Sequence, residues 1–86
     1  MKNYRKTYLQ AAALIASDKE TCCCHAICTA QNAKPYERKD ENLLLAEYLK
    51  PKSIKHQSEI WWDSGSYEDD KNARIFALLL MAEICK

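Results

Sequence analysis

The sequence predicts an all-α domain, a small bundle of three to four helices with a buried C-terminal helix. Glycine occurs once and proline twice in 86 residues, whereas an all-β domain needs turn residues at regular short intervals. Alanine, leucine, lysine and glutamate are abundant, and these residues favour helices. Apolar residues also recur at helical spacing in several segments. The length of the chain suits one domain over residues 1–86.

The first helix is expected over residues 3–16, where apolar residues recur every three or four positions. This segment has a basic start and a short Ala/Leu run, as a secretion signal does, but Gln10 interrupts the run and no A-x-A site follows. No apolar run approaches the roughly 18 residues that span a bilayer. We therefore expect a cytoplasmic protein that does not enter a membrane.

Three further helices are expected along the chain. The second covers the cysteine-rich segment TCCCHAICTA, with Thr21 as its N-cap. The third covers residues 37–49 or 40–49, because Pro51 disfavours helical backbone in the residue before it. The segment KSIKHQSEIWWDSG is then interpreted as a loop with at most a short turn. The fourth covers residues 66–84 and begins with Ser66 and Asp69 at capping-box spacing.

The last helix contains ARIFALLLMAEIC, where nearly every position except Arg74 and Glu83 is apolar. A helix that is apolar all round is buried, either inside its own domain or against another copy. We therefore expect a homo-oligomer, with residues 73–85 or the Trp61–Trp62 turn in the interface. Replacing Leu79 or Leu80 by alanine should cost about 2–5 kcal/mol. The residues expected to be most buried are Leu14, Ile15, Ile27, Leu44, Leu45, Leu49, Phe76, Leu79, Leu80 and Ile84.

Charge is nearly balanced over the whole chain, with a formal net charge of +1, but it is unevenly distributed. Residues 1–39 carry seven Lys/Arg against three Asp/Glu, a net of +4. Residues 57–86 carry three against six, a net of −3. Neither half has the basic excess that is typical of nucleic-acid binding, so DNA and RNA are not expected partners. The opposite charges favour pairing of the halves within one bundle or between subunits.

Four cysteines and one histidine lie within residues 22–28. On a helix Cys24, His25 and Cys28 share a face, which makes them the candidate ligands of a structural zinc ion. Such a site usually needs two separated ligand pairs, and a second pair is absent. We therefore interpret the cysteines as small apolar packing residues, with no metal and no other cofactor. A zinc-binding helical domain is the third functional hypothesis for the chain.

The N-terminal segment MKNYRKTY combines aromatic and basic residues. Tyr4 and Tyr8 are one helical turn apart, and Lys2, Arg5 and Lys6 lie on neighbouring faces. Aromatic rings can stack on a base while cations hold phosphate, so these five residues are candidate nucleotide ligands. The alternative interpretation is an ordinary amphipathic helix whose lysines extend along its apolar surface.

Trp61 and Trp62 are adjacent in the expected loop, where extended backbone points their rings in opposite directions. One ring can then anchor the core while the other contacts a partner protein. The alternative is that both rings cover a small core. Paired carboxylates in a recognisable setting, a phosphate-binding glycine loop and Ser-His-Asp spacing are all missing from the sequence, so enzymatic activity is not expected.

Four segments of the chain together resemble small accessory proteins of tailed bacteriophages and prophages. They are YxxAAxLIAS, a cysteine pair, a tryptophan pair and ARxxALLLMAEI, which correspond here to Tyr8 with residues 11–17, Cys23–Cys24, Trp61–Trp62 and residues 73–84. The resemblance implies a non-enzymatic protein of the host cytoplasm that inhibits a bacterial defence system by binding one of its proteins. Alternatively, it implies an oligomeric sponge that sequesters a cyclic nucleotide used as an immune signal.

Overall fold

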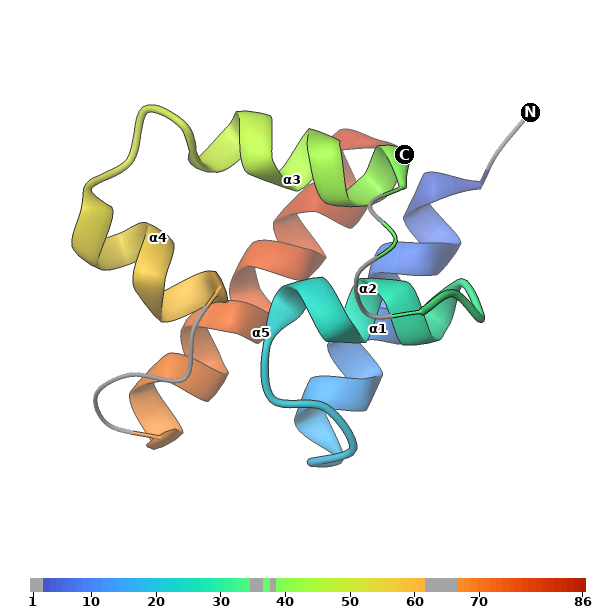
Figure 1. Cartoon of the computed structure of the whole chain (residues 1–86), viewed down its shortest axis with the longest axis horizontal. Helices are drawn as coiled ribbons and strands as arrows, with labels where there is room; N and C mark the ends of the chain where they lie inside the picture. The colour runs from blue at the N-terminus through green and yellow to red at the C-terminus, as the bar shows by residue number, and fades with distance from the viewer. Residues whose placement is uncertain (1–2, 35–36, 38, 62–66) are drawn as a thin grey trace.

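The structure is a computed structural model that describes residues 3–34, 37, 39–61 and 67–86, without the side chains of residues 67–69. Within these residues the chain forms five helices and no strand (Figure 1): α1 (Tyr4–Ala16), α2 (Cys23–Ala30), α3 (Asp40–Leu49), α4 (Ile54–Trp61) and α5 (Tyr67–Ile84). The predicted all-α class is therefore confirmed. None of the described helices is both long enough and apolar enough to cross a membrane.

The described residues form five helices where three to four were expected, because the segment interpreted as a loop contains α4. The backbone N–H of His56 donates to Ser53 Oγ at 3.1 Å, so Ser53 caps the start of this helix. The N-cap of α2 also differs from the prediction, since Cys22 Sγ rather than Thr21 accepts a hydrogen bond from His25 N. Ser66, the predicted cap of α5, lies outside the described residues.

Helices α1 and α2 end without glycine. Asp18 and Asn32 follow them with φ angles of 62° and 56°, in the left-handed region that these short polar residues tolerate. Beyond α1, Lys19 N donates to Leu14 O at 2.9 Å, and the equivalent bond beyond α2 measures 2.8 Å. Both ends are therefore Schellman motifs, which explains how a chain with one glycine makes sharp turns between its helices.

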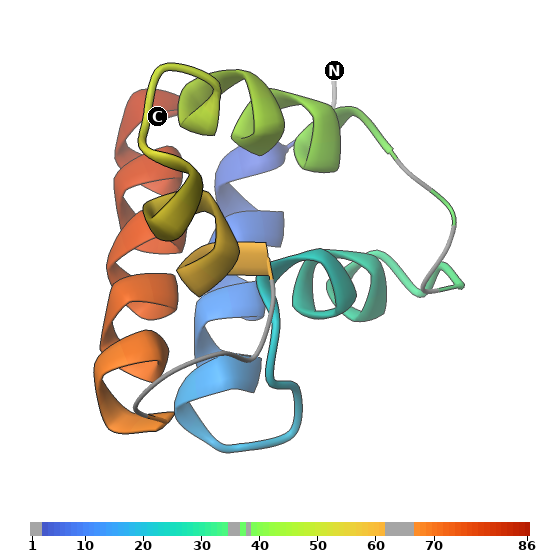
Figure 2. The same cartoon turned by 60° about the vertical axis from the view of Figure 1, so that its left-hand side comes forward.

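Helices α1 and α5 form the central pair of the fold. They run antiparallel and lie side by side, and they share the most extensive contact between any two elements (Figure 2). Helix α2 packs against α1, and α4 packs against α5. Helix α3 lies across one end of the α1–α5 pair, at the start of α1 and the end of α5, and also contacts α2. Two sides of α5 are therefore covered and its outer side is not.

The core lies between α1 and α5 and extends to the helices packed on them. The predicted burial of Ile15, Ile27, Leu45 and Leu49 is confirmed. From α5 the buried residues are instead Ala77, Leu78, Met81 and Ala82. The predicted core residues Phe76, Leu79 and Ile84 are exposed, as is Leu44, while Leu14 and Leu80 are only partly buried. The C-terminal helix is therefore buried on the sides that meet α1 and α4, and the predicted burial of Phe76, Leu79 and Ile84 was wrong because these residues lie on its uncovered side.

Arg74, one of two polar interruptions in the apolar run of α5, is fully buried. Its Nη1 donates to Thr21 O at 2.7 Å, and its Nη2 lies 4.0 Å from Asp70 Oδ2 one turn earlier. The Cys23 thiol donates to Arg74 O at 3.8 Å. Arg74 therefore joins α5 to the loop between α1 and α2, while Asp70 compensates its charge.

Candidate functional site

A groove of about 730 Å³ lies between α5 and the turn that joins α3 to α4. Its volume falls within the range of roughly 300–1,000 Å³ that is usual for binding sites. One wall comes from the end of α3 and the start of α4, and the other from one side of α5. The lining residues are Tyr48, Lys52, Ser53, His56, Asn72, Ala73, Phe76 and Ala77.

Hydrogen bonds to backbone carbonyl oxygens hold the wall formed by the α3–α4 turn. Lys52 N donates to Leu49 O at 2.8 Å, and Gln57 Nε2 donates to Lys52 O at 2.9 Å. The ammonium of Lys52 lies 5.0 Å from the centroid of the Tyr48 ring, a cation–π distance. Tyr48 itself packs against the core. The cation at this wall is therefore held over an aromatic ring instead of extending freely into solvent.

The groove is apolar inside and basic at its rim. Alanine side chains and the rings of Tyr48 and Phe76 form the apolar surface, and Lys52 and His56 are the basic groups. None of the described lining residues is acidic; Glu59, whose Oε2 lies 3.6 Å from His56 Nδ1, is one turn further along α4.

Large apolar side chains are exposed at the groove. Phe76, which lines the groove, is 68% exposed, and Ile54, which follows the lining residue Ser53 in the sequence without lining the groove itself, is 83% exposed. These are the two most exposed large apolar residues in the described part of the chain. Leu79, one turn after Phe76, is 46% exposed. Contiguous exposed apolar side chains are typical of a surface that contacts a partner.

The structure does not bring together the four candidate nucleotide ligands that it describes. Tyr8 is fully buried and its Oη donates to Glu41 O at 2.7 Å, so its ring cannot stack on a ligand. This prediction was wrong because Tyr8 lies on the same face of α1 as the core residues of that helix. Tyr4 Oη lies 3.3 Å from Asp40 Oδ2, and Lys2 lies outside the described residues. Arg5 and Lys6 line a shallow depression on the outside of α1.

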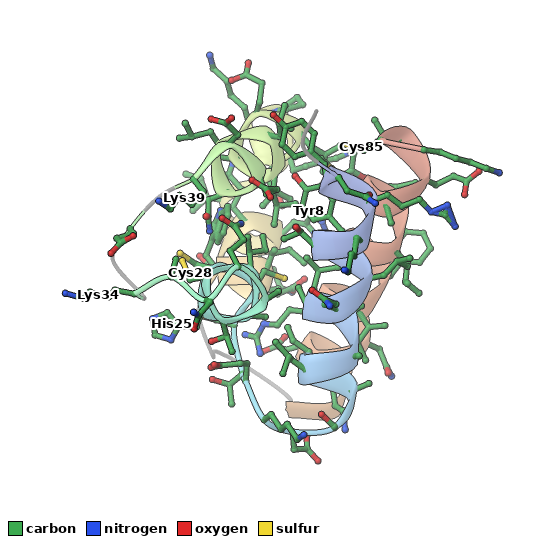
Figure 3. The ribbon with its side chains drawn as sticks, turned by 90° about the vertical axis from the view of Figure 1, so that its right-hand side faces the viewer. Tyr8, His25, Cys28, Lys34, Lys39 and Cys85 are labelled. Atoms are coloured by element: carbon green, nitrogen blue, oxygen red, sulfur yellow. The ribbon has the colours of Figure 1, made fainter. Side chains whose placement is uncertain are left out.

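The three candidate metal ligands do not form a site. Cys28 is buried and Cys24 half-buried, whereas His25 is exposed and projects away from the bundle (Figure 3). The predicted shared face of Cys24 and Cys28 is confirmed, since both sulfurs contact Asn42. The described residues contain no group of three or more His, Cys, Asp or Glu side chains that could hold a metal ion.

Asn42, which the sequence reasoning missed, connects the cysteine segment to α3. Its Nδ2 donates to Cys24 O at 3.4 Å and to Cys24 Sγ at 3.6 Å. Its Oδ1 accepts from Lys39 N at 3.1 Å and from the Cys28 thiol at 3.9 Å. The amide is fully buried, so these contacts satisfy a polar group that would otherwise destabilise the core.

Burial raises the pKa of the Cys22, Cys23 and Cys28 thiols, because the thiolate is disfavoured away from water. The guanidinium of Arg74 acts in the opposite direction on Cys23, but its effect is smaller than that of burial. A raised pKa keeps a thiol protonated and therefore poorly nucleophilic. These three residues behave as packing groups in the fold.

Trp61 ends α4 and packs, partly buried, against the core, while Trp62 lies outside the described residues. The groove residues Tyr48, Lys52, His56 and Phe76 were missed by sequence reasoning. Ser53, followed by a segment with helical spacing, was the available signal for α4.

Comparisons with protein-family models, with curated proteins and with solved structures give no match for this chain.

Proposed function

We propose that the protein is a small, non-enzymatic binding protein that acts by direct contact with another protein, as an inhibitor of a bacterial defence system. The exposure of Phe76, whose aromatic ring lines the groove, carries the first part of this proposal. Exposed aromatic and aliphatic side chains beside a pocket are the usual anchors of a protein interface. The resemblance to phage accessory proteins supports the choice of a defence protein as the target.

The nucleotide sponge loses one of its two expected stacking residues, because Tyr8 is buried. Self-association through residues 73–85 or the Trp61–Trp62 turn stays a prediction. Ile84, which is exposed in α5 and does not line the groove, favours it. Light scattering at micromolar concentration measures it directly, and a mass near 9.9 kDa would contradict it.

The proposal is tested by expressing the chain in bacteria that carry one of a panel of phage-defence systems. Plaques of a phage restricted by that system are then counted. We expect the wild-type chain to restore plaques in one of these strains and Phe76→Ser to lose the effect. Because Phe76 is exposed, the variant should fold normally, which circular dichroism would verify.

The matched control is Leu9→Ser, which removes an exposed apolar side chain from α1, away from the groove. This variant should restore plaques as wild type does. Restoration by Phe76→Ser at the wild-type level, or no restoration by wild type in any strain, would contradict the proposal.

A further inference from the structure

Three properties of the groove decide which partner surface fits it. They are its shape, its charge and the absence of buried, unpaired nitrogen and oxygen atoms among its lining side chains. The apolar contact area is elongated along α5, because it includes Phe76 within the groove and Leu79 one turn beyond it. An exposed apolar strip along a helix, beside a groove, is a setting in which an amphipathic helix of a partner docks with residues spaced three and four apart.

Basic groups surround one side of this apolar area. Lys52 and His56 line the groove, and Lys50 and Lys55 are exposed beside them in the sequence. Among the described residues, Glu47 is exposed on α3 and Glu59 lies 3.6 Å from His56. The first turn of α4 also presents the positive end of a helix dipole on this side. A partner with acidic side chains flanking its apolar face therefore matches this surface in charge.

A small polar ligand such as a nucleotide fits less well. Sites for such ligands enclose most of the ligand and orient it with a few fixed polar groups. None of the lining side chains has a buried nitrogen or oxygen left without a hydrogen bond. Ser53 Oγ already accepts the capping hydrogen bond from His56 N. The lining supplies apolar contact area and charge. A protein segment that lies along the groove contacts more of this surface than a small ligand does.

We infer that the groove binds an acidic amphipathic α-helical segment of the partner protein. Its apolar residues lie on Phe76 and Leu79, and its carboxylates face Lys52 and Lys55. This inference rests on the proposed function, since it names the kind of segment through which the target is held. It adds that binding depends on the sign of the charge at the α3–α4 turn.

The experiment measures fluorescence anisotropy with a labelled peptide of about 15 residues, four helical turns. The peptide carries leucine at positions spaced three and four apart and glutamate elsewhere. A second peptide has lysine in place of every glutamate, and adenosine monophosphate is used as an unlabelled competitor. We expect wild type to bind the acidic peptide about tenfold more tightly than the basic one, with less difference at high salt.

The double variant Lys52→Glu/Lys55→Glu should reverse this preference. The matched control Lys6→Glu/Lys19→Glu, which makes the same charge change on exposed residues outside the groove, should keep it. Equal binding of the two peptides by wild type would overturn the inference. Displacement of the acidic peptide by adenosine monophosphate would also overturn it, in favour of a nucleotide site.

The plaque assay separates failure of this inference from failure of the proposed function. If Phe76→Ser loses plaque restoration while Lys52→Glu/Lys55→Glu keeps it, the protein is an inhibitor whose partner segment is not acidic. If the wild-type chain restores no plaques but prefers the acidic peptide, the groove binds as inferred and the assignment to host defence is wrong.

Discussion

The hydroxyl of Tyr8 donates a 2.7 Å hydrogen bond to the backbone carbonyl oxygen of Glu41, joining the middle of α1 to the first turn of α3. The two residues are 33 positions apart in the sequence, and both the ring and the bond are buried. Burial, with smaller contributions from Cys85 and Glu41, raises the pKa of the Tyr8 phenol well above its usual value. The hydroxyl therefore acts as a structural donor that holds α3 across the central helix pair.

Replacing Tyr8 by phenylalanine should lower the free energy of unfolding by about 0.5–1.5 kcal/mol, the net value of one buried hydrogen bond. Urea unfolding followed by circular dichroism measures the change. The control is Tyr4→Phe, whose hydroxyl makes a longer and exposed contact to Asp40. It should change stability by less than about 0.5 kcal/mol. Equal changes in the two variants would contradict the prediction, because the buried bond would then contribute no more to the free energy of unfolding than the exposed one.

Leu78→Ala and Leu79→Ala should differ sharply although the residues are neighbours in α5. Leu78 is fully buried, so its truncation should cost about 2–5 kcal/mol. Leu79 is nearly half exposed, so its truncation should cost less than about 1 kcal/mol. Thermal unfolding of the two variants in parallel measures the difference. Equal destabilisation would mean that the outer side of α5 is covered in solution, as self-association predicts.

Arg74→Met should be strongly destabilising, because it removes the hydrogen bond to Thr21 O and leaves Asp70 as a buried charge without its guanidinium. Breaking a buried pair on one side costs about 3–5 kcal/mol. The double variant Asp70→Asn/Arg74→Met should recover part of this loss, because the uncompensated charge is then absent. Denaturant unfolding of both variants tests this, and a double variant less stable than the single one would contradict it.

Stability should fall at alkaline pH. Burial raises the folded-state pKa of Cys23 and Cys28 above the ordinary 9.0, and that of Tyr8 above 10.0. Below these ordinary values both states hold the protons. As the pH rises through them, the unfolded chain loses protons that the folded chain keeps, so unfolding becomes more favourable. Each group contributes a slope of up to about 1.4 kcal/mol per pH unit.

The measurement is the melting temperature between pH 7 and 11 under reducing conditions. It should be nearly constant at first and then decline, beginning near pH 9 as the cysteines titrate. In Tyr8→Phe the part of the decline above pH 10 should be smaller, because one of the titrating groups is missing. A melting temperature that stays constant to pH 11 would contradict this account of the buried groups.

The sequence by itself determined the fold class and the positions of α1, α3 and most of α5. These depend on local properties: helical spacing of apolar residues, few glycines, and Pro51 just after α3. The burial of Ile15 and Ile27 could also be predicted from the sequence, because each residue lies on the apolar side of its own helix. Ser53 was a usable signal for α4, but most of the residues that follow it are polar, so the apolar spacing of a helix was difficult to recognise there.

Tertiary structure alone decided which side of α5 is buried and where the groove lies. In ARIFALLLMAEIC apolar residues point in every direction, so the pattern cannot distinguish Leu78 from Leu79; only the contacts with α1 and α4 do. Arg74 is buried because Thr21 O, 53 residues earlier, meets its guanidinium. The groove likewise needs Lys52 and Phe76 on opposite walls. Such relationships arise from the packing of helices that are distant in the sequence, and they cannot be predicted from the local spacing of residues.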